Sequence, residues 1–364
     1  MVSSETLGRA PSGERVRVFT ITTPRAKLRV MEYGAALLSL EVPDASGAKG
    51  DVLLGLSSLE AYFDNPTCHG STVGPIANRT DNAEMTVGST VCHLERNNGP
   101  DQRNNLHSSL VEGLHKRVWQ GEAVNEKNAV RLACCLRDGE LGLPGNRAFS
   151  CEVSLADLPS GATRLNVAYS CTTDAPTFVN MSNHSYFNLA GAHAGSVMDE
   201  LVKLEADEFL PIREDSVSTG EIRAVDGSPF DFREPKPLGR DIDENDEQLR
   251  RARGYDHCFC VRGWKPGGQP RLALTAVDPG SGRTLEIRVT TPGAHLYTGN
   301  WLDDPRAKGG VAYGPRAGFA FEPEFYPDCA HHSSWPQPIC TPAQPYTQTI
   351  VYQFGTTSKH EATL

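Results

Sequence analysis

The sequence lacks the features that mark membrane proteins and nucleic-acid binders. It has no uninterrupted stretch of about 18 apolar residues, the length that spans a bilayer. Its first residues, MVSSETLGRAPSGERVRV, contain no apolar signal-peptide core. It also has no Lys/Arg-rich run, and its formal charge is −10, which disfavours phosphate-rich polymers as partners. We therefore predict a cytoplasmic protein that binds neither nucleic acid nor membrane.

Disulfide and phosphate-binding motifs are missing as well. Ten cysteines occur among the 364 residues, but none are spaced as C-x-x-C. Several, such as Cys134, Cys151 and Cys171, occupy apolar strand positions, so we interpret them as buried thiols in a reducing compartment. No glycine-rich phosphate loop follows a predicted strand. We therefore expect no cofactor that is bound through a phosphate group.

The sequence is rich in turn residues and in short alternating apolar runs. It contains 34 glycines and 25 prolines, and apolar residues recur at every second position in many segments bounded by Gly, Pro, Asn or Asp. This pattern is typical of half-buried antiparallel strands. The clearest alternating segments are residues 38–42, 130–136, 149–155, 165–171, 272–274, 285–289 and 350–354.

Helical patterns are scarce. Only residues 57–64 and 243–252 are predicted to form helices, of two or three turns each. The second segment is acidic at its start and basic at its end, as the helix dipole favours. With no internal repeat and no linker, the chain is predicted to be all-β: one large antiparallel β-sandwich domain over residues 1–364, with a few short helices.

Polar residues interrupt this apolar background in five segments. Each segment adjoins an apolar strand, where unpaired polar groups would be costly. A cavity shared by all five would relieve that cost, because the polar groups could pair with one another or with a ligand. The segments are GPIANRTDN (74–82), NNLHSS (104–109), NMSNHSYFNLAG (180–191), GYDHCF (254–259) and GFAFEPEFYPD (318–328).

The side chains in these segments suit a sugar better than a phosphate. Asn78, Arg79, Asn183 and Asp256 present paired donors and acceptors that match vicinal hydroxyl groups. A phosphate would require clustered basic residues or a glycine-rich helix start. The sequence therefore predicts a carbohydrate ligand.

Acid–base chemistry is indicated by two histidines and one glutamate. His107 and His184 lie in separate polar segments, and Glu322 follows the apolar run 319–321. An ionised carboxyl could act as base and an imidazolium as acid in one site. Taken singly, a histidine on a strand is more often a satisfied core residue, and a glutamate in an apolar run is more often a charge on an edge strand.

At these residues the sequence resembles the aldose 1-epimerase (galactose mutarotase) family. The resemblance extends from YGAALLSLEVPD (33–44) through DVLLGL (51–56) to QTIVYQF (348–354). Its most specific motifs are NMSNHSYFNLAG, GYDH, PGAHLYTGNWLD (292–303) and the first glutamate of GFAFEPEFYPD. The family fold is a large antiparallel β-sandwich, in agreement with the strand pattern.

The resemblance implies a role for each candidate residue. Glu322 would remove the proton of the anomeric hydroxyl, and His184 would protonate the ring oxygen, so that the ring opens and closes again on its other face. His107 would hydrogen-bond near the ring oxygen. The remaining hydroxyls would be held by Asn78, Arg79, Asp256 and His295. The polar neighbours of His184 are expected to orient its ring. Glu324 is an alternative base, because it shares a strand face with Glu322.

Three positions depart from the family pattern. His295 stands where the family usually has glutamine, which predicts a shifted sugar preference. LHSS replaces LHGG, so Ser108 and Ser109 could redirect the loop that carries His107. Gly74-Pro75 replaces the usual Gly-Arg, while Asn78 and Arg79 are retained.

Other functions remain open at this point. The chain could be a sugar-binding or regulatory protein without turnover, an epimerase of phosphorylated hexoses, or a polysaccharide lyase or hydrolase. The second would need more basic residues than Arg79, and hydrolases usually employ a carboxylate pair. We expect a free aldohexose as substrate, a monomer or homodimer, and neither a metal nor a cofactor. Neither His331-His332 nor Asp256-His257 has recognised ligand spacing.

Overall fold

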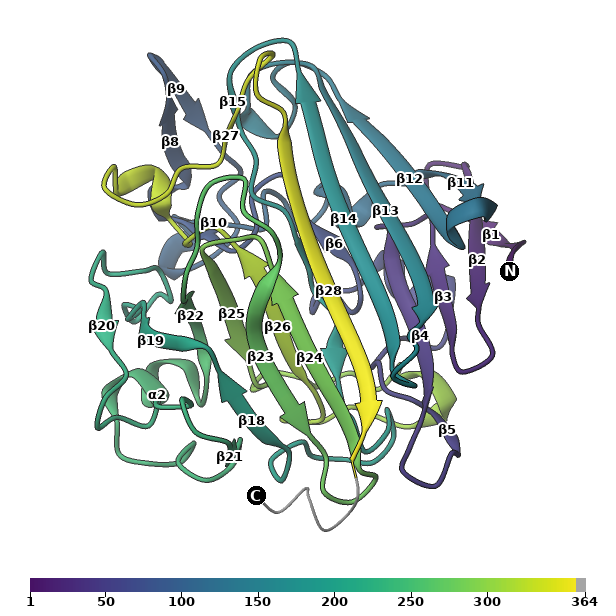
Figure 1. Cartoon of the computed structure of the whole chain (residues 1–364). Coiled ribbons are helices and arrows are strands. Elements are labelled where there is room, and N and C mark those ends of the chain that lie inside the picture. Colours follow the sequence, from purple (N-terminus) through teal and green to yellow (C-terminus); the bar gives the residue numbers. More distant parts are fainter. Residues whose placement is uncertain (358–364) are drawn as a thin grey trace.

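The computed structural model describes residues 1–357 and contains three large antiparallel sheets (Figure 1). The largest has nine strands, in the order β11 (Gln120–Val124), β12 (Ala129–Leu136), β13 (Arg147–Asp157), β14 (Thr163–Thr173), β28 (Tyr346–Thr356), β24 (Arg283–Val289), β23 (Arg271–Val277), β18 (Leu201–Leu204) and β21 (Lys236–Pro237). Its last strand in sequence, β28, lies in the middle, between β14 and β24.

Two smaller sheets contribute to the same hydrophobic core as the nine-stranded sheet. The six-stranded sheet has the order β17 (Tyr186–Phe187), β26 (Phe319–Glu324), β25 (Gly293–Tyr297), β22 (Asp256–Val261), β19 (Ala206–Phe209) and β20 (Arg223–Ala224). The five-stranded sheet runs β1 (Val2–Arg9), β2 (Arg15–Thr22), β3 (Lys27–Met31), β4 (Ala36–Pro43) and β5 (Lys49–Asp51).

Four short strand pairs connect the loops around the six-stranded sheet. They are β6 (Thr72–Val73) with β16 (Ser182–Asn183), β7 (Arg79–Thr80) with β10 (Asn105–Leu106), β8 (Glu84–Val87) with β9 (Thr90–His93), and β15 (Thr177–Phe178) with β27 (Ile339–Cys340). The pair β8–β9 is a hairpin, whereas the other three pairs place segments that are separated in the sequence beside one another.

The continuous core combines inward-facing residues of the three sheets. Leu40 of β4, Val167 of β14, Ile350 of β28, Leu296 of β25 and Phe321 of β26 are each at most 1% exposed and belong to one cluster. The all-β sandwich prediction is confirmed. The predicted boundary at residue 364 lies outside the described residues, and the single domain stays a prediction.

Most alternating segments became strands with the predicted inward face, but residues 272–274 did not. A β-bulge between Leu272 and Leu274 inserts an extra residue in β23. As a result Ala273 and Leu274 are buried, while Leu272 is only half-buried. The expectation that Leu272 and Leu274 share one buried face was therefore wrong.

Both predicted helices exist, but each is shorter than expected. Helix α1 (Leu59–Phe63) begins after Ser58, whose side chain accepts a hydrogen bond from the Ala61 backbone N–H. Helix α2 (Glu247–Ala252) begins four residues later than predicted, because Asp246 caps it through the N–H groups of Gln248 and Leu249. Within residues 1–357, the structure has no helix long and apolar enough to cross a membrane.

Candidate active site

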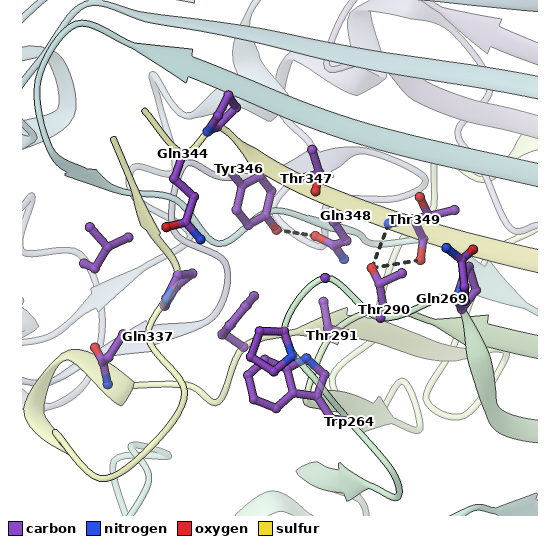
Figure 2. Close-up of a pocket in the computed structure, with 18 residues that line it drawn as sticks. Trp264, Gln269, Thr290, Thr291, Gln337, Gln344, Tyr346, Thr347, Gln348 and Thr349 are labelled. Carbon is purple, nitrogen blue, oxygen red and sulfur yellow. Dashed lines mark hydrogen bonds between the residues drawn. The ribbon is translucent and has the colours of Figure 1, made fainter. Parts of the chain in front are cut away.

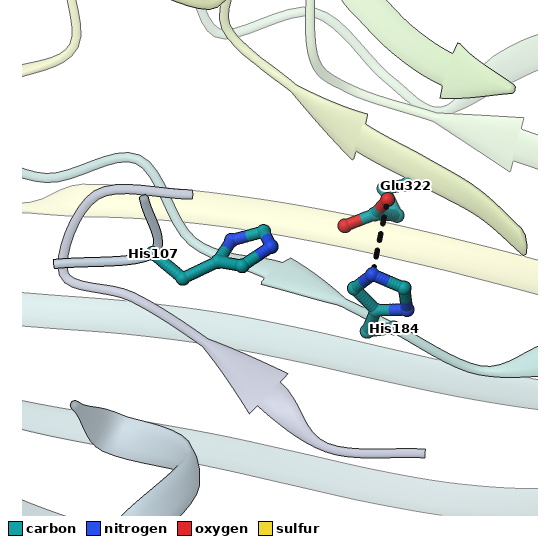
Figure 3. A group of neighbouring side chains, drawn as sticks. All are labelled: His107, His184 and Glu322. Carbon is teal, nitrogen blue, oxygen red and sulfur yellow. Dashed lines mark ion pairs between the residues drawn. The ribbon is translucent and has the colours of Figure 1, made fainter. Parts of the chain in front are cut away.

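The side chains of β26 alternate between the core and a polar face. Phe319 and Phe321 point into the core, whereas Glu322 and Glu324 belong to the other face and are 2% and 0% exposed. The Glu322 Oε1 atom lies 3.5 Å from Nε2 of His184 (Figure 3). No hydrogen-bond partner within the described chain reaches Glu322 Oε2. The two residues predicted as base and acid therefore face each other.

The backbone of His184 is held by hydrogen bonds to residues 70–71. His184 N–H donates to the carbonyl of Ser71 at 2.9 Å, and its carbonyl accepts from Gly70 N–H at 3.0 Å. Its ring packs against Tyr186, with centroids 5.0 Å apart, and edge-on against His107 at 5.7 Å. Aromatic packing and Glu322 thus hold the imidazole.

The polar neighbours of His184 do not bond to its ring, contrary to expectation, and Nδ1 has no hydrogen-bond partner among residues 1–357. Instead Ser182 and Asn180 bond to backbone groups of an adjoining segment. Ser182 Oγ donates to the carbonyl of Pro323 at 2.9 Å, and Asn180 pairs with both N–H and C=O of Phe325, at 2.8 and 3.1 Å. These bonds fix the distance between the segment of His184 and the strand of Glu322.

His107 is positioned by Asn78. The backbone N–H of Asn78 donates to Nδ1 of His107 at 3.0 Å, so the neutral ring carries its proton on Nε2. Burial, followed by the nearby His184, lowers the pKa of His107 well below its ordinary value. His107 is therefore a neutral hydrogen-bond donor.

The serines that follow His107 do not displace it. Ser108 adopts a left-handed backbone conformation with φ of 65°, which usually favours glycine. Its hydroxyl compensates by accepting from the N–H of Ile76 at 2.8 Å and donating to the Ile76 carbonyl at 3.3 Å. Ser109 Oγ accepts from Val111 and Glu112 N–H. The preceding Gly74-Pro75 bond is cis.

Asn78, Arg79 and Asp256 lie close to one another and line the same hollow as His107, His184 and Glu322. The Asn78 Oδ1 atom accepts from Arg79 N–H and Nη1, at 3.0 and 3.2 Å. Arg79 Nη2 lies 3.7 Å from Asp256 Oδ2. Burial would raise the pKa of Asp256, but His295 and Arg79 outweigh it and lower that pKa below its ordinary value. Asp256 is thus a buried carboxylate.

His295 contacts Asp256 and Asn78 but does not line the hollow itself. Its Nε2 contacts Asp256 Oδ1 at 2.8 Å, and its Nδ1 lies 3.4 Å from Glu324 Oε1. Asn78 Nδ2 also lies 3.3 Å from Glu324 Oε1 and 3.0 Å from His295 Nδ1. Burial opposes a charge on His295, but the two carboxylates outweigh it and raise its pKa to about 10. We therefore describe His295 as an imidazolium, which, like the Asn78 amide, directs its N–H to Glu324.

A hollow of about 200 Å³ opens between these groups. It is lined by Pro66, Thr67, Cys68, Asn78, Arg79, Leu106, His107, His184, Tyr186, Asp256, Tyr297, Trp301 and Glu322. The structure thus brings together six of the seven predicted site residues. His295 and the alternative base Glu324 are absent from the lining.

Sequence reasoning missed several lining residues. Tyr297 and Trp301 lie in the PGAHLYTGNWLD motif, which could have indicated them. The segment 66–68 carries no motif, and only its approach in space places it at the hollow.

The charge state of Glu322 and His184 differs from the expectation. Burial raises the pKa of Glu322 to about 8, with Glu324 adding to the rise and His295 opposing it. Burial also lowers the pKa of His184 to about 3, helped by His69. Without sugar the pair is therefore neutral at pH 7, with its single proton on Glu322. The expected carboxylate–imidazolium pair is wrong for this state.

His107, His184 and Glu322 also offer one potential metal-ligand atom each, all within 4.8 Å of one another (Figure 3). These are the same groups that meet the requirements of proton transfer. The residues predicted not to bind metal are engaged differently: His257 Nδ1 accepts from Asp256 N–H, and His331 Nδ1 contacts Asp328 Oδ1 at 2.7 Å.

Comparison with known proteins identifies the family of the chain. The sequence profile described as "Aldose 1-epimerase" matches residues 17–353. The chain belongs to the aldose 1-epimerase family. It is 34% identical to a galactose mutarotase of Bos taurus, covering 97% of this chain and 98% of that protein. It is 33% identical to an aldose 1-epimerase of Escherichia coli (strain K12), covering 96% and 99%.

Solved structures share the fold. A GalM/aldose epimerase homologue from C. elegans superimposes with a TM-score of 0.84 at 26% identity, covering 94% of this chain and 99% of that one. A galactose 1-epimerase from Lactobacillus acidophilus NCFM gives a TM-score of 0.82 at 24% identity, covering 98% and 99%, which supports the fold alone. The sequence-based assignment to the family and to its β-sandwich fold is confirmed.

Proposed function

We propose that this family member is an aldose 1-epimerase, an isomerase that interconverts the α and β anomers of a free aldohexose such as galactose or glucose. The observation that carries the proposal is the placement of Glu322 and His184, which face each other at 3.5 Å in one small polar hollow. A carboxyl and an imidazole at this separation can reach the two oxygens that exchange protons when a pyranose ring opens.

The pair needs one proton in total to catalyse both directions. When a sugar enters, its hydroxyl groups can donate to Glu322, stabilise its carboxylate and favour transfer of the proton to His184. Glu322 then takes the proton of the anomeric hydroxyl while His184 protonates the ring oxygen, and the C1–O5 bond breaks. After rotation about C1–C2 the roles reverse and the ring closes.

The other lining residues bind and orient the sugar in this proposal. His107 donates its Nε2 proton near the ring oxygen, where it also stabilises developing charge. Asn78, Arg79 and Asp256 hold the remaining hydroxyls through paired hydrogen bonds. Acid and base each contribute about 10²–10⁴ in rate, so no metal or cofactor is required by this chemistry.

His295 was predicted to bind substrate directly, and we now propose an indirect role. Both of its ring nitrogens are close to protein groups, so it has no free donor for a sugar. By holding Asp256 it would still influence which hexose fits.

The protein would act on a small-molecule substrate in the cytoplasm, as a monomer or homodimer without other partners.

The alternatives fit the site less well. A sugar-binding protein without turnover has no use for a buried acid–base pair. An epimerase of phosphorylated hexoses needs more cations than the hollow provides, since Arg79 is the only Lys or Arg in its lining.

Polarimetry of freshly dissolved α-D-galactose and α-D-glucose tests the proposal. The purified protein is expected to accelerate mutarotation, and Glu322→Gln and His184→Ala should each reduce kcat by about 10²–10⁴. Glu324→Gln is the matched control, because it changes a neighbouring carboxyl outside the hollow. Loss of turnover in Glu324→Gln with full activity in Glu322→Gln would reassign the base.

Dialysis against EDTA belongs in the same experiment. Activity should survive it, because proton transfer uses only side chains. Activity that disappears with EDTA and returns with a divalent ion would instead assign His107, His184 and Glu322 as metal ligands.

A further inference from the structure

A second hollow, separate from the catalytic one, lies between the loop 264–270 and the segment 337–349 (Figure 2). Its volume is about 650 Å³, roughly three times the 200 Å³ of the catalytic hollow. None of its 18 lining residues is charged. Four are glutamines (Gln269, Gln337, Gln344 and Gln348) and four are threonines (Thr290, Thr291, Thr347 and Thr349).

The floor of this hollow is a fixed polar surface. Tyr346 and Gln348 of β28 are only 6% and 2% exposed, and the tyrosine hydroxyl hydrogen-bonds the glutamine Oε1. Gln348 Nε2 donates to the carbonyl of Pro323 at 2.8 Å, and Tyr346 Oη accepts from Met181 N–H at 3.2 Å. These bonds engage the polar atoms of both side chains with the protein, so the floor is rigid and the groups open to a ligand lie at the rim.

An aromatic wall stands beside that floor. Trp264 is half-buried and packs edge-on against Phe325, with ring centroids 6.0 Å apart. The backbone of Phe325 is in turn held by Asn180. A flat apolar face of this kind can cover the carbon-bound hydrogens of a sugar ring, while the amides bond its hydroxyls.

Donors and acceptors remain available around the rim. Within the described residues, the side chains of Gln269, Gln344 and Thr347 form no hydrogen bond to the protein. An amide offers both a donor and an acceptor, as a sugar hydroxyl does. A charged ligand would find no counter-ion in this lining.

From these observations we infer that the second hollow is a non-catalytic binding site for a neutral oligosaccharide. The site itself does not depend on the proposed epimerase activity, but the expected size of its ligand rests on that proposed function. If one sugar ring fills the catalytic hollow, the larger volume accommodates two or three. Gln348 bonds the carbonyl of Pro323, which lies between Glu322 and Glu324. Tyr346 bonds the N–H of Met181, which precedes Ser182 in the segment of His184. The second hollow therefore contacts both segments that carry the proposed catalytic pair.

Tryptophan fluorescence can test the site directly. The chain has four tryptophans; Trp119 and Trp335 are buried, Trp264 lines the second hollow and Trp301 the catalytic one. In a Trp301→Phe background, titration uses neutral oligosaccharides that have no free anomeric centre: trehalose, sucrose, raffinose and methyl maltotrioside. At least one is expected to change the emission saturably, and the change should vanish in Trp264→Phe/Trp301→Phe.

Matched variants define the expected loss. Measured calorimetrically in the otherwise unaltered chain, Trp264→Ala should weaken binding about tenfold or more, and Gln344→Leu severalfold, because they remove the stacking face and one amide. Circular dichroism and mutarotation of galactose should stay unchanged in both, which separates lost binding from misfolding. An acidic probe, trigalacturonate, should not bind.

Three results would overturn the inference. One is the absence of binding by every neutral probe up to about 50 mM. Another is binding that survives Trp264→Ala. The third is a concentration-dependent dimer, seen by sedimentation, that Trp264→Ala dissociates, since the hollow would then be an interface between copies of this chain.

Discussion

His184 and Glu322 are brought to 3.5 Å in a buried hollow, and burial shifts their pKa values in opposite directions. Two groups this close share their protons, so the observed titrations belong to the pair. In the proposed mechanism the active form of the pair carries one proton. It gains a second only near the pKa of about 3 of His184, and it loses its only proton near the pKa of about 8 of Glu322.

This charge state gives the first prediction. Above pH 8 both groups are deprotonated and no acid is left, so kcat/KM should fall about tenfold per pH unit. Between about pH 4 and 7 the single proton is retained, and kcat/KM should stay level. Polarimetry over pH 4 to 10, corrected for the uncatalysed rate, measures the profile. A fall on the acidic side of neutrality would contradict the assigned protonation.

The charges around Glu322 give the second prediction. His295 lowers the pKa of Glu322 and Glu324 raises it. His295→Gln should therefore move the basic fall of kcat/KM to higher pH, and Glu324→Gln should move it to lower pH. Because His295 holds Asp256, His295→Gln should also change the relative rates on galactose and glucose. Identical relative rates in that variant would remove its role in sugar preference.

Residue identities could be predicted better than residue environments. The motif around His184 indicated a candidate acid, yet it could not show that Ser182 bonds to the β26 backbone and Asn180 to Phe325 just beyond it. Likewise His295 was predicted to bind substrate, but its place outside the hollow depends on Asp256 and Glu324, which contact its two ring nitrogens. Such relations are set by tertiary contacts between distant segments.

At the scale of elements, contacts between β26 and the segment 182–185 keep Glu322 and His184 close to each other. Ser182 Oγ bonds the carbonyl of Pro323, whereas the hydroxyl of Ser185 is buried without a partner in the described chain. The two serines are three residues apart and nearly equally buried, at 0% and 1% exposure. They therefore form a matched pair.

The third prediction compares alanine at these two positions. Ser182→Ala loses one buried hydrogen bond and should lower the free energy of unfolding by about 1 kcal/mol. It should also reduce kcat severalfold, because the distance between His184 and Glu322 is no longer fixed. Ser185→Ala removes a buried hydroxyl that has no partner in the described chain, so it should not lower the free energy of unfolding. Urea unfolding and polarimetry measure both; equal effects would show that the Ser182 bond is unimportant.

The existence of most strands could be predicted from the period-two patterns, but the local irregularities within the elements could not. The pattern in residues 149–155 and 165–171 predicted long strands correctly, because each buries one whole face. The bulge in β23 was not visible, since Leu272 and Leu274 have the same spacing as a regular strand. The start of α2 depended on which of several acidic residues became the cap.

At the scale of the whole molecule, the ten cysteines are free thiols, and nine are buried. Only Cys135 is exposed, on the outward face of β12. This distribution agrees with their interpretation as small apolar side chains.

The fourth prediction follows from that burial. In the native protein a thiol reagent such as DTNB should react rapidly with one cysteine, and with ten after denaturation in guanidinium. Cys135→Ser should abolish the rapid reaction and leave activity unchanged. Fewer than ten reactive thiols in the denatured, unreduced protein would reveal a disulfide.

The central position of β28 has a consequence for biosynthesis. A ribosome completes residues 346–356 only after every other strand of the nine-stranded sheet has been made, yet this strand joins β14 to β24. Until it emerges, both neighbours present unpaired edges, which favour aggregation. The nascent polypeptide therefore passes through a vulnerable interval that ends only when its final strand is inserted.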